Sequence, residues 1–159
     1  MSCGRRLVPW IAGAWGLMFA PEVAAQVQIS GLSDLQLGTW SGSGDLEGVG
    51  DHCVLGPRGG RYAILATGVG SGGAFVLLNG PGSLPFQVDY SDDGGGWSQM
   101  SPGVPLTGQR GAPNENQFER CLAGQRSPQR VRVRVLAQDL GAAVAGSYDG
   151  SLTLLVTPE

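Results

Sequence analysis

Hydrophobic and polar residues alternate with a period of two wherever a pattern is legible in this chain. Such alternation is typical of half-buried β-strands, in which successive side chains point to opposite faces. Two pairs alternate, Val27 with Ile29 and Leu35 with Leu37. Longer alternating runs cover residues 84–90, 131–135 and 148–156, and short apolar runs cover residues 61–66 and 74–78. They predict about seven short strands, and no amphipathic stretch is long enough to predict a substantial helix.

Glycine-containing turns separate these strands. The chain has 28 glycines among 159 residues, well above the roughly 7% of ordinary proteins. The sequence Asn79-Gly80-Pro81-Gly82 lies between two predicted strands, and both dipeptides favour turn geometry, so it predicts a β-hairpin. Many short strands joined by such turns predict an all-β fold, an antiparallel β-sandwich.

Residues 91–129 do not follow the pattern. This stretch is rich in Gly, Pro, Ser, Asn and Gln, and a structureless loop of its length is uncommon in a compact domain. We expect one or two short irregular strands here, built around scattered apolar side chains.

The first 25 residues have the organisation of a secretory signal peptide. Arg5 and Arg6 precede an uncharged, mostly apolar run over residues 7–20, and small residues occupy positions 23–25. The run suits a signal peptide better than a membrane span or a buried N-terminal helix, because about 20 residues are needed to cross a bilayer. We predict cleavage after Ala25, export to the periplasm, cell surface or exterior, and a single domain over residues 26–159.

The predicted mature chain is mildly acidic. It has eight arginines, no lysine and twelve acidic residues, a net charge near −4. This balance gives no electrostatic support for binding nucleic acid or an anionic membrane. No later stretch is long and apolar enough to predict a membrane-spanning helix.

Two cysteines, Cys53 and Cys121, remain after removal of the signal peptide. Export to an oxidising compartment and the even count favour a disulfide over two free thiols. Closing a loop of this length is worth roughly 4 kcal/mol in the chain-entropy treatment.

Two motifs suggest ligands but lack the context that each ligand needs. Residues 68–73 match GxGxxG, yet a predicted strand follows rather than the helix that a dinucleotide phosphate requires. Asp89, Asp92 and Asp93 lie beside glycines, but they lack the alternating spacing and the terminal Glu of a calcium loop. We expect these carboxylates to cap turns.

The remaining polar candidates are also weak. His52 is the sole histidine and lies beside Cys53; it has no zinc or triad signature, so we expect a surface-loop residue. Arg130, Arg132 and Arg134 alternate with valines, which predicts a half-exposed strand with a solvated face, although a partner or anion contact is the sharper alternative. We therefore expect no catalytic residue, no metal and no cofactor, and no enzyme.

Two stretches nevertheless resemble a known family. Residues 29–40 (ISGLSDLQLGTW) resemble the opening strand of the spore coat protein U domain family, which includes subunits of archaic chaperone–usher pili. Gly146-Ser147-Tyr148, followed by alternating Leu152, Leu154 and Val156, resembles the ending of that family. About a third of the mature chain carries the likeness.

The resemblance implies a fold and a mode of assembly. It implies an immunoglobulin-like sandwich that lacks its final strand and assembles when a periplasmic chaperone, and then a neighbouring subunit at the usher, fills the gap with a donor strand. The groove residues carried over from the family are Val27, Ile29, Leu35, Leu37, Tyr148, Leu152, Leu154 and Val156. Only Gln26 to Ser30 precede Gly31 after the predicted cleavage, so we expect a subunit that accepts a strand rather than donates one.

A second hypothesis comes from another class of protein. The domain would close its own groove and act as a secreted monomeric sandwich that binds a ligand or surface through the long stretch 91–129. Loops on a rigid sandwich commonly carry such functions.

Overall fold

The computed structural model describes residues 27–57, 60–92, 95–126 and 128–159. The predicted signal peptide and its cleavage site after Ala25 lie outside these residues. The described part contains ten strands, two α-helices and one 3₁₀ turn at Ser71–Gly73. The strands are β1 Gln28–Ser30, β2 Leu46–Leu55, β3 Arg61–Thr67, β4 Val76–Asn79, β5 Gly82–Pro85, β6 Gln87–Ser91, β7 Ser98–Met100, β8 Leu106–Arg110, β9 Gln129–Val135 and β10 Thr153–Pro158; the helices are α1 Glu115–Leu122 and α2 Ala137–Ala142.

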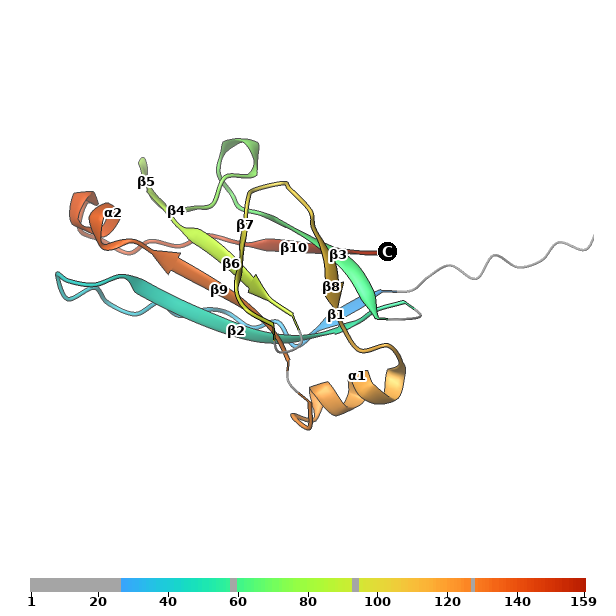
Figure 1. The fold of residues 1–159 in the computed structure, drawn as a ribbon. Coiled ribbons are helices and arrows are strands. Elements are labelled where there is room, and N and C mark those ends of the chain that lie inside the picture. Colours follow the sequence, from blue (N-terminus) through green and yellow to red (C-terminus); the bar gives the residue numbers. More distant parts are fainter. Residues whose placement is uncertain (1–26, 58–59, 93–94, 127) are drawn as a thin grey trace, which may run out of the picture.

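The strands form antiparallel sheets, which confirms the all-β class (Figure 1). The larger sheet has the order β1-β2-β9-β6-β7, and the second has the order β10-β3-β8. A two-stranded hairpin of β4 and β5 completes the described strands. Each neighbouring pair in these sheets is antiparallel.

One hydrophobic core is shared by the two larger sheets. Val131, Val133 and Val135 of β9 contribute from one sheet, with 4%, 6% and 0% of their surface exposed, and Ile64 of β3 contributes from the other with 0% exposed. The alternating pattern of β9 therefore behaves as expected, because every second side chain points into the core.

Several predicted strands differ from the observed ones. The longest strand, β2, was not predicted, because Gly48 and Gly50 interrupt its apolar pattern. Leu35 and Leu37 were predicted to lie in a strand, but residues 31–40 form none, although both leucines pack against the core. The predicted strand over residues 84–90 is two strands, because Phe86 separates β5 from β6.

The hairpin prediction is confirmed. Asn79 and Gly82 are the last paired residues of β4 and β5. Gly80, at the first turn position, has a φ of +53°, in the left-handed region that glycine adopts without a steric cost.

Residues 91–129 contain more structure than the sequence pattern indicates. The two expected short strands are β7 and β8, and helix α1 follows them. Asn114 begins α1, its side-chain oxygen accepting a hydrogen bond from the Gln117 backbone N–H at 3.0 Å. This helix was not predicted.

A disulfide between Cys53 and Cys121 ties α1 to β2, which confirms the predicted pairing. The Cα atoms of the two cysteines are 6.0 Å apart. Leu55, Ala112 and Phe118 pack around the cysteines and form a second, smaller core cluster with them. The helix is therefore held by both a covalent bond and apolar contacts.

Candidate functional site

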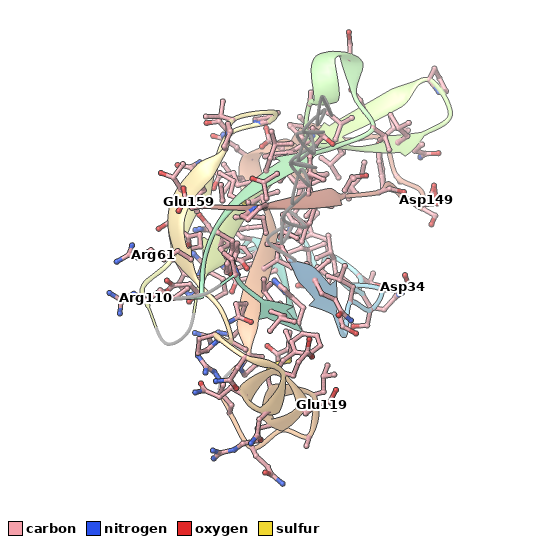
Figure 2. The ribbon with its side chains drawn as sticks, turned by 90° about the vertical axis from the view of Figure 1, so that its right-hand side faces the viewer. Asp34, Arg61, Arg110, Glu119, Asp149 and Glu159 are labelled. Atoms are coloured by element: carbon pink, nitrogen blue, oxygen red, sulfur yellow. A yellow bond between two sulfur atoms is a disulfide. The ribbon has the colours of Figure 1, made fainter. Side chains whose placement is uncertain are left out.

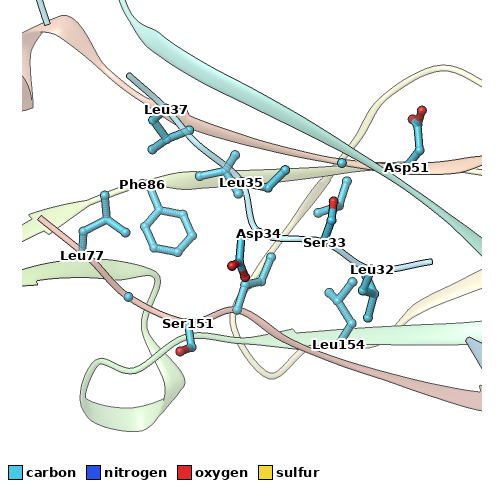
Figure 3. A pocket seen from close by; sticks show the side chains of 15 residues that line it. Leu32, Ser33, Asp34, Leu35, Leu37, Asp51, Leu77, Phe86, Ser151 and Leu154 are labelled. Atoms are coloured by element: carbon cyan, nitrogen blue, oxygen red, sulfur yellow. The ribbon is translucent and has the colours of Figure 1, made fainter. Parts of the chain in front are cut away.

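A cleft of about 390 Å³ lies between residues 31–40 and the chain that leads into β10 (Figure 3). Its walls are largely apolar, and strands β2, β4, β9 and β10 contribute to them, together with Phe86 between β5 and β6. The lining residues that carry its apolar character are Leu32, Leu35, Leu37, Leu77, Phe86, Val131, Val133, Leu152 and Leu154. We call this space the cleft below.

One wall of the cleft is an extended segment, residues 31–40, that belongs to no strand. Among the described residues, its backbone makes no hydrogen bond to another backbone group. The segment runs beside the part of β2 that pairs with β9, whereas β1 pairs only with Cys53, Val54 and Leu55 at the far end of β2.

Two glycines of β2 explain how this segment comes so close. A Cβ atom on Gly48 would lie 2.8 Å from Cδ2 of Leu37, and a Cβ atom on Gly50 would lie 2.9 Å from Cδ2 of Leu35. The missing side chains thus leave the space that the two leucines occupy on the inner face of β2. The same two glycines that interrupt the apolar pattern of β2 therefore allow residues 31–40 to form the wall of the cleft.

The opposite wall is β10, which pairs with β3 along one side. No strand in the described part of the chain pairs with its other side. Its inward residues Leu154 and Val156, and Leu152 just before the strand, are only partly buried, although they contact the core. Two backbone edges with hydrogen-bonding capacity thus face each other across an apolar space.

The structure brings together most of the predicted groove residues. Leu35, Leu37, Leu152 and Leu154 line the cleft, and Tyr148 lines an adjoining space of about 1030 Å³. Val27, Ile29 and Val156 contact the core but line neither space.

The sequence prediction missed some of the lining residues. Phe86, Val131 and Val133 form the buried floor of the cleft, and Leu77 comes from the hairpin. The two valines could have been found from their alternation, because it marks an inward face. Which inward residues lie at an open edge depends on strand order, which period-two patterning does not reveal.

The adjoining space extends the cleft toward α2. Trp40 and Tyr148 flank it, but the polar atom of each ring is used within the fold. Trp40 Nε1 donates to the Gly44 carbonyl at 2.8 Å, and the Tyr148 hydroxyl donates to the Val144 carbonyl at 2.9 Å. These aromatic rings therefore hold loops in place.

His52 was predicted to lie in a surface loop, and this prediction is wrong. It lies in β2 with 1% of its surface exposed. Its Nε2 shares a hydrogen bond of 3.0 Å with the Tyr90 hydroxyl, which in turn shares one of 2.7 Å with the Tyr62 hydroxyl. Strand β2 continues past His52 to Leu55, and the alternation of side chains along it places His52 on the buried face.

Burial dominates the electrostatics of this chain of hydrogen bonds. Desolvation lowers the pKa of His52 to about 4, so the ring is neutral at pH 7. Burial, and then the charge and hydrogen bond of Tyr62, raise the pKa of Tyr90 well above its usual range. A neutral imidazole and two tyrosine hydroxyls, enclosed in the core, have the character of a structural polar network.

The arginines of β9 do not form the fully solvated face that the pattern indicates. Arg132 and Arg134 both donate to Oδ2 of Asp89, at 2.8 and 3.0 Å, and all three residues are at least partly buried. The ring of Trp97 lies 5.0 Å from the guanidinium carbon of Arg130 and 4.4 Å from that of Arg132. The carboxylate of Asp89, considered above for calcium, is thus held by two arginines.

The GxGxxG stretch has a structural role in the described fold. Residues Ser71–Gly73 form a single 3₁₀ turn, after which the chain enters β4. A Cβ atom on Gly68 would lie 2.3 Å from the Ala74 carbonyl oxygen. The glycine is required there because two stretches of backbone approach closely.

No protein-family model matches the chain, and no curated protein sequence matches it.

In the described ranges, no helix is long and apolar enough to span a membrane. Those same ranges contain no group of three His, Cys, Asp or Glu residues that could hold a metal ion.

Proposed function

We propose that this chain is an exported, non-enzymatic structural or adhesive subunit that assembles by accepting an extended strand from another protein. The cleft carries this proposal: two backbone edges, residues 31–40 and β10, flank an apolar floor. A strand added there would gain main-chain hydrogen bonds for affinity, and alternate side chains would enter the cleft and set the register. Covering such an edge also removes a site for aggregation.

Strand order supports the proposal. A constant-type immunoglobulin domain has sheets ABED and CFG. With β1, β2, β3, β6, β9 and β10 taken as A to F, the larger sheet contains the order A-B-E-D and the second sheet pairs C with F. Strand G would pair with the free side of F, the side of β10 that borders the cleft.

The proposed partners follow from the resemblance to spore coat U and chaperone–usher subunits. A periplasmic chaperone would fill the cleft during export, and a neighbouring subunit would replace it at the usher. Strand β1 already pairs with β2, so it is not free to leave as a donor without loss of those contacts. This favours a subunit that accepts a strand.

The test is complementation with a peptide. The purified chain is titrated with a soluble twelve-residue peptide of alternating valine and uncharged polar residues, and amide hydrogen exchange is followed by NMR. We expect slower exchange at β10 amides and an increased melting temperature. No binding, or protection only at the β7 or β8 edges, would refute the proposal.

Two substitutions on one strand provide a matched control. Leu154 points into the cleft, whereas Leu155 is 55% exposed on the other face of β10. Leu154→Asp places a charge where the peptide's side chains must pack and should abolish binding. Leu155→Asp should bind the peptide as the unmodified chain does.

A second candidate function is a monomer that closes its own groove and binds a ligand through residues 91–129. The observation that favours it is the position of Leu35 and Leu37, which already cover the inner face of β2. In that case the peptide would not bind, and the chain would remain monomeric and soluble without a chaperone.

A further inference from the structure

The charges around the cleft are all of one sign. The ionisable side chains among its lining residues are Asp34 and Asp51, and the adjoining space adds Asp149. No arginine or histidine of the described chain lines either space. Figure 2 shows Asp34 and Asp149 on one side of the molecule and Arg61 and Arg110 on the opposite side.

The three aspartates are not equivalent. Figure 3 shows the Asp34 carboxylate directed from its segment toward Ser151, among the side chains that line the cleft, whereas the Asp51 carboxylate points away from them. Within the part of the chain that the structure describes, Asp34 has no hydrogen bond or ion pair through its side chain. It is therefore a free acceptor at an apolar site.

A strand laid across the cleft would remove water from this carboxylate. Desolvation of an ionised carboxylate is unfavourable unless a cation or hydrogen-bond donors replace the water. An occupant with apolar residues alone provides neither. A lysine or arginine at the position facing Asp34 provides a charge and up to five donors.

We propose that the cleft selects a strand that carries one lysine or arginine, placed opposite Asp34, among its alternating apolar residues. This inference rests on the proposed function and adds the partner's chemistry to it. The occupant belongs to a different protein, since β1 of this chain is uncharged and already paired with β2. Opposite charges would raise specificity and the rate of encounter more than affinity.

The test is a set of peptides that differ at one position. Starting from the uncharged alternating peptide, a single lysine replaces each polar or apolar residue in turn, and affinity is measured by calorimetry at low salt. One position should bind up to roughly fivefold more tightly with lysine than with glutamine, the range of partly exposed ion pairs. High salt should reduce this preference.

Three variants assign the preference to one carboxylate. Asp34→Asn should remove the lysine preference, and Asp34→Lys should reverse it, so that a glutamate peptide binds best. Asp51→Asn is the matched control and should retain the preference, because that side chain points away from the cleft. Both positions are exposed, so folding should be unaffected.

The outcomes separate the two proposals. Tight binding of the uncharged peptide without any lysine preference, or a preference that survives Asp34→Asn, would overturn this inference alone. Failure of every peptide to bind would overturn the proposed function as well. Self-association of the chain that Leu154→Asp prevents would identify the occupant as a second copy and would also overturn the inference.

Discussion

Two regions of this molecule differ in how completely they bury the inward side chains of their strands. In the closed region, the side chains of His52, Tyr62 and Tyr90 are at most 1% exposed. In the open region, along the cleft, Leu154 of β10 and Leu152 just before it are only partly buried. Tyr90 and Leu154 both lie in alternating stretches of the sequence, yet only Tyr90 is fully buried. Alternation thus shows which face of a strand is apolar but not whether the protein itself covers that face.

The difference has an energetic consequence. A fully buried aliphatic side chain has already gained its transfer free energy, roughly 2 kcal/mol or more, whereas a half-buried one has gained only part of it. The open region thus retains apolar surface that an incoming strand can bury. The following predictions compare the two regions, from the largest expected effect to the smallest.

Loss of the disulfide should have the largest effect, and it should act on the closed region. Replacing both Cys53 and Cys121 with serine releases a loop with a sequence separation of 68, which should cost about 4 kcal/mol of unfolding free energy. Urea denaturation measures this loss. Peptide binding in the cleft at low temperature should persist; a variant that folds but no longer binds would show that the two regions are coupled.

Acid should destabilise the closed region through His52. The pKa of this residue is about 4 in the folded chain and 6.5 ordinarily, so the unfolded chain binds a proton first as the pH falls. The free energy of unfolding should therefore decrease by about 3 kcal/mol between pH 6.5 and 4, with no contribution above pH 7.

Comparison with His52→Phe isolates this effect from the titration of carboxylates. Denaturation series at several pH values should give a flatter stability profile for the variant than for the original chain. Parallel profiles would mean that His52 takes up a proton equally well in both states.

Matched truncations on paired strands should measure the contrast directly. Ile64→Ala in the closed core should cost about 2 kcal/mol more than Leu154→Ala at the cleft, because less packing is lost at a partly buried site. With saturating donor peptide, the cost of Leu154→Ala should approach that of Ile64→Ala. An unchanged difference in melting experiments would indicate that the peptide does not cover Leu154.

The smallest effect should come from the outer face of the larger sheet. Trp97→Leu removes the ring that contacts Arg130 and Arg132 and should cost about 1 kcal/mol. Peptide affinity should not change, since Trp97 does not line the cleft. A change in affinity would show that this face communicates with β10.

Sequence patterns predicted the all-β class and the hairpin at Asn79, and the cysteine count with the predicted export predicted the disulfide. The four predicted groove residues that line the cleft came from the family resemblance instead. Sequence patterns failed where tertiary contacts override local preference. β2 contains two glycines because Leu35 and Leu37 occupy the space of their side chains, a reason that lies far away in the structure. His52 can be buried because Tyr90, from another strand, shares a hydrogen bond with its Nε2, and Tyr90 is itself bonded to Tyr62.

Helix α1 could have been found by a closer inspection. Asn114 precedes a segment in which Phe118, Cys121 and Leu122 follow helical spacing, a short but recognisable signal. Asp34, in contrast, has no distinguishing feature in the sequence. Its interest depends on a cleft that six separate stretches of the chain form together.

The disulfide between β2 and α1 also determines how far the chain can extend under tension. A force applied to the two ends cannot lengthen the segment between Cys53 and Cys121, whose sequence separation is 68. At about 3.4 Å per residue, this withholds about 230 Å of contour length. A pulled chain would thus extend only outside the disulfide loop, while strands β3 to β8 stayed inside it. Reduction of the disulfide would allow the segment inside the loop to extend as well.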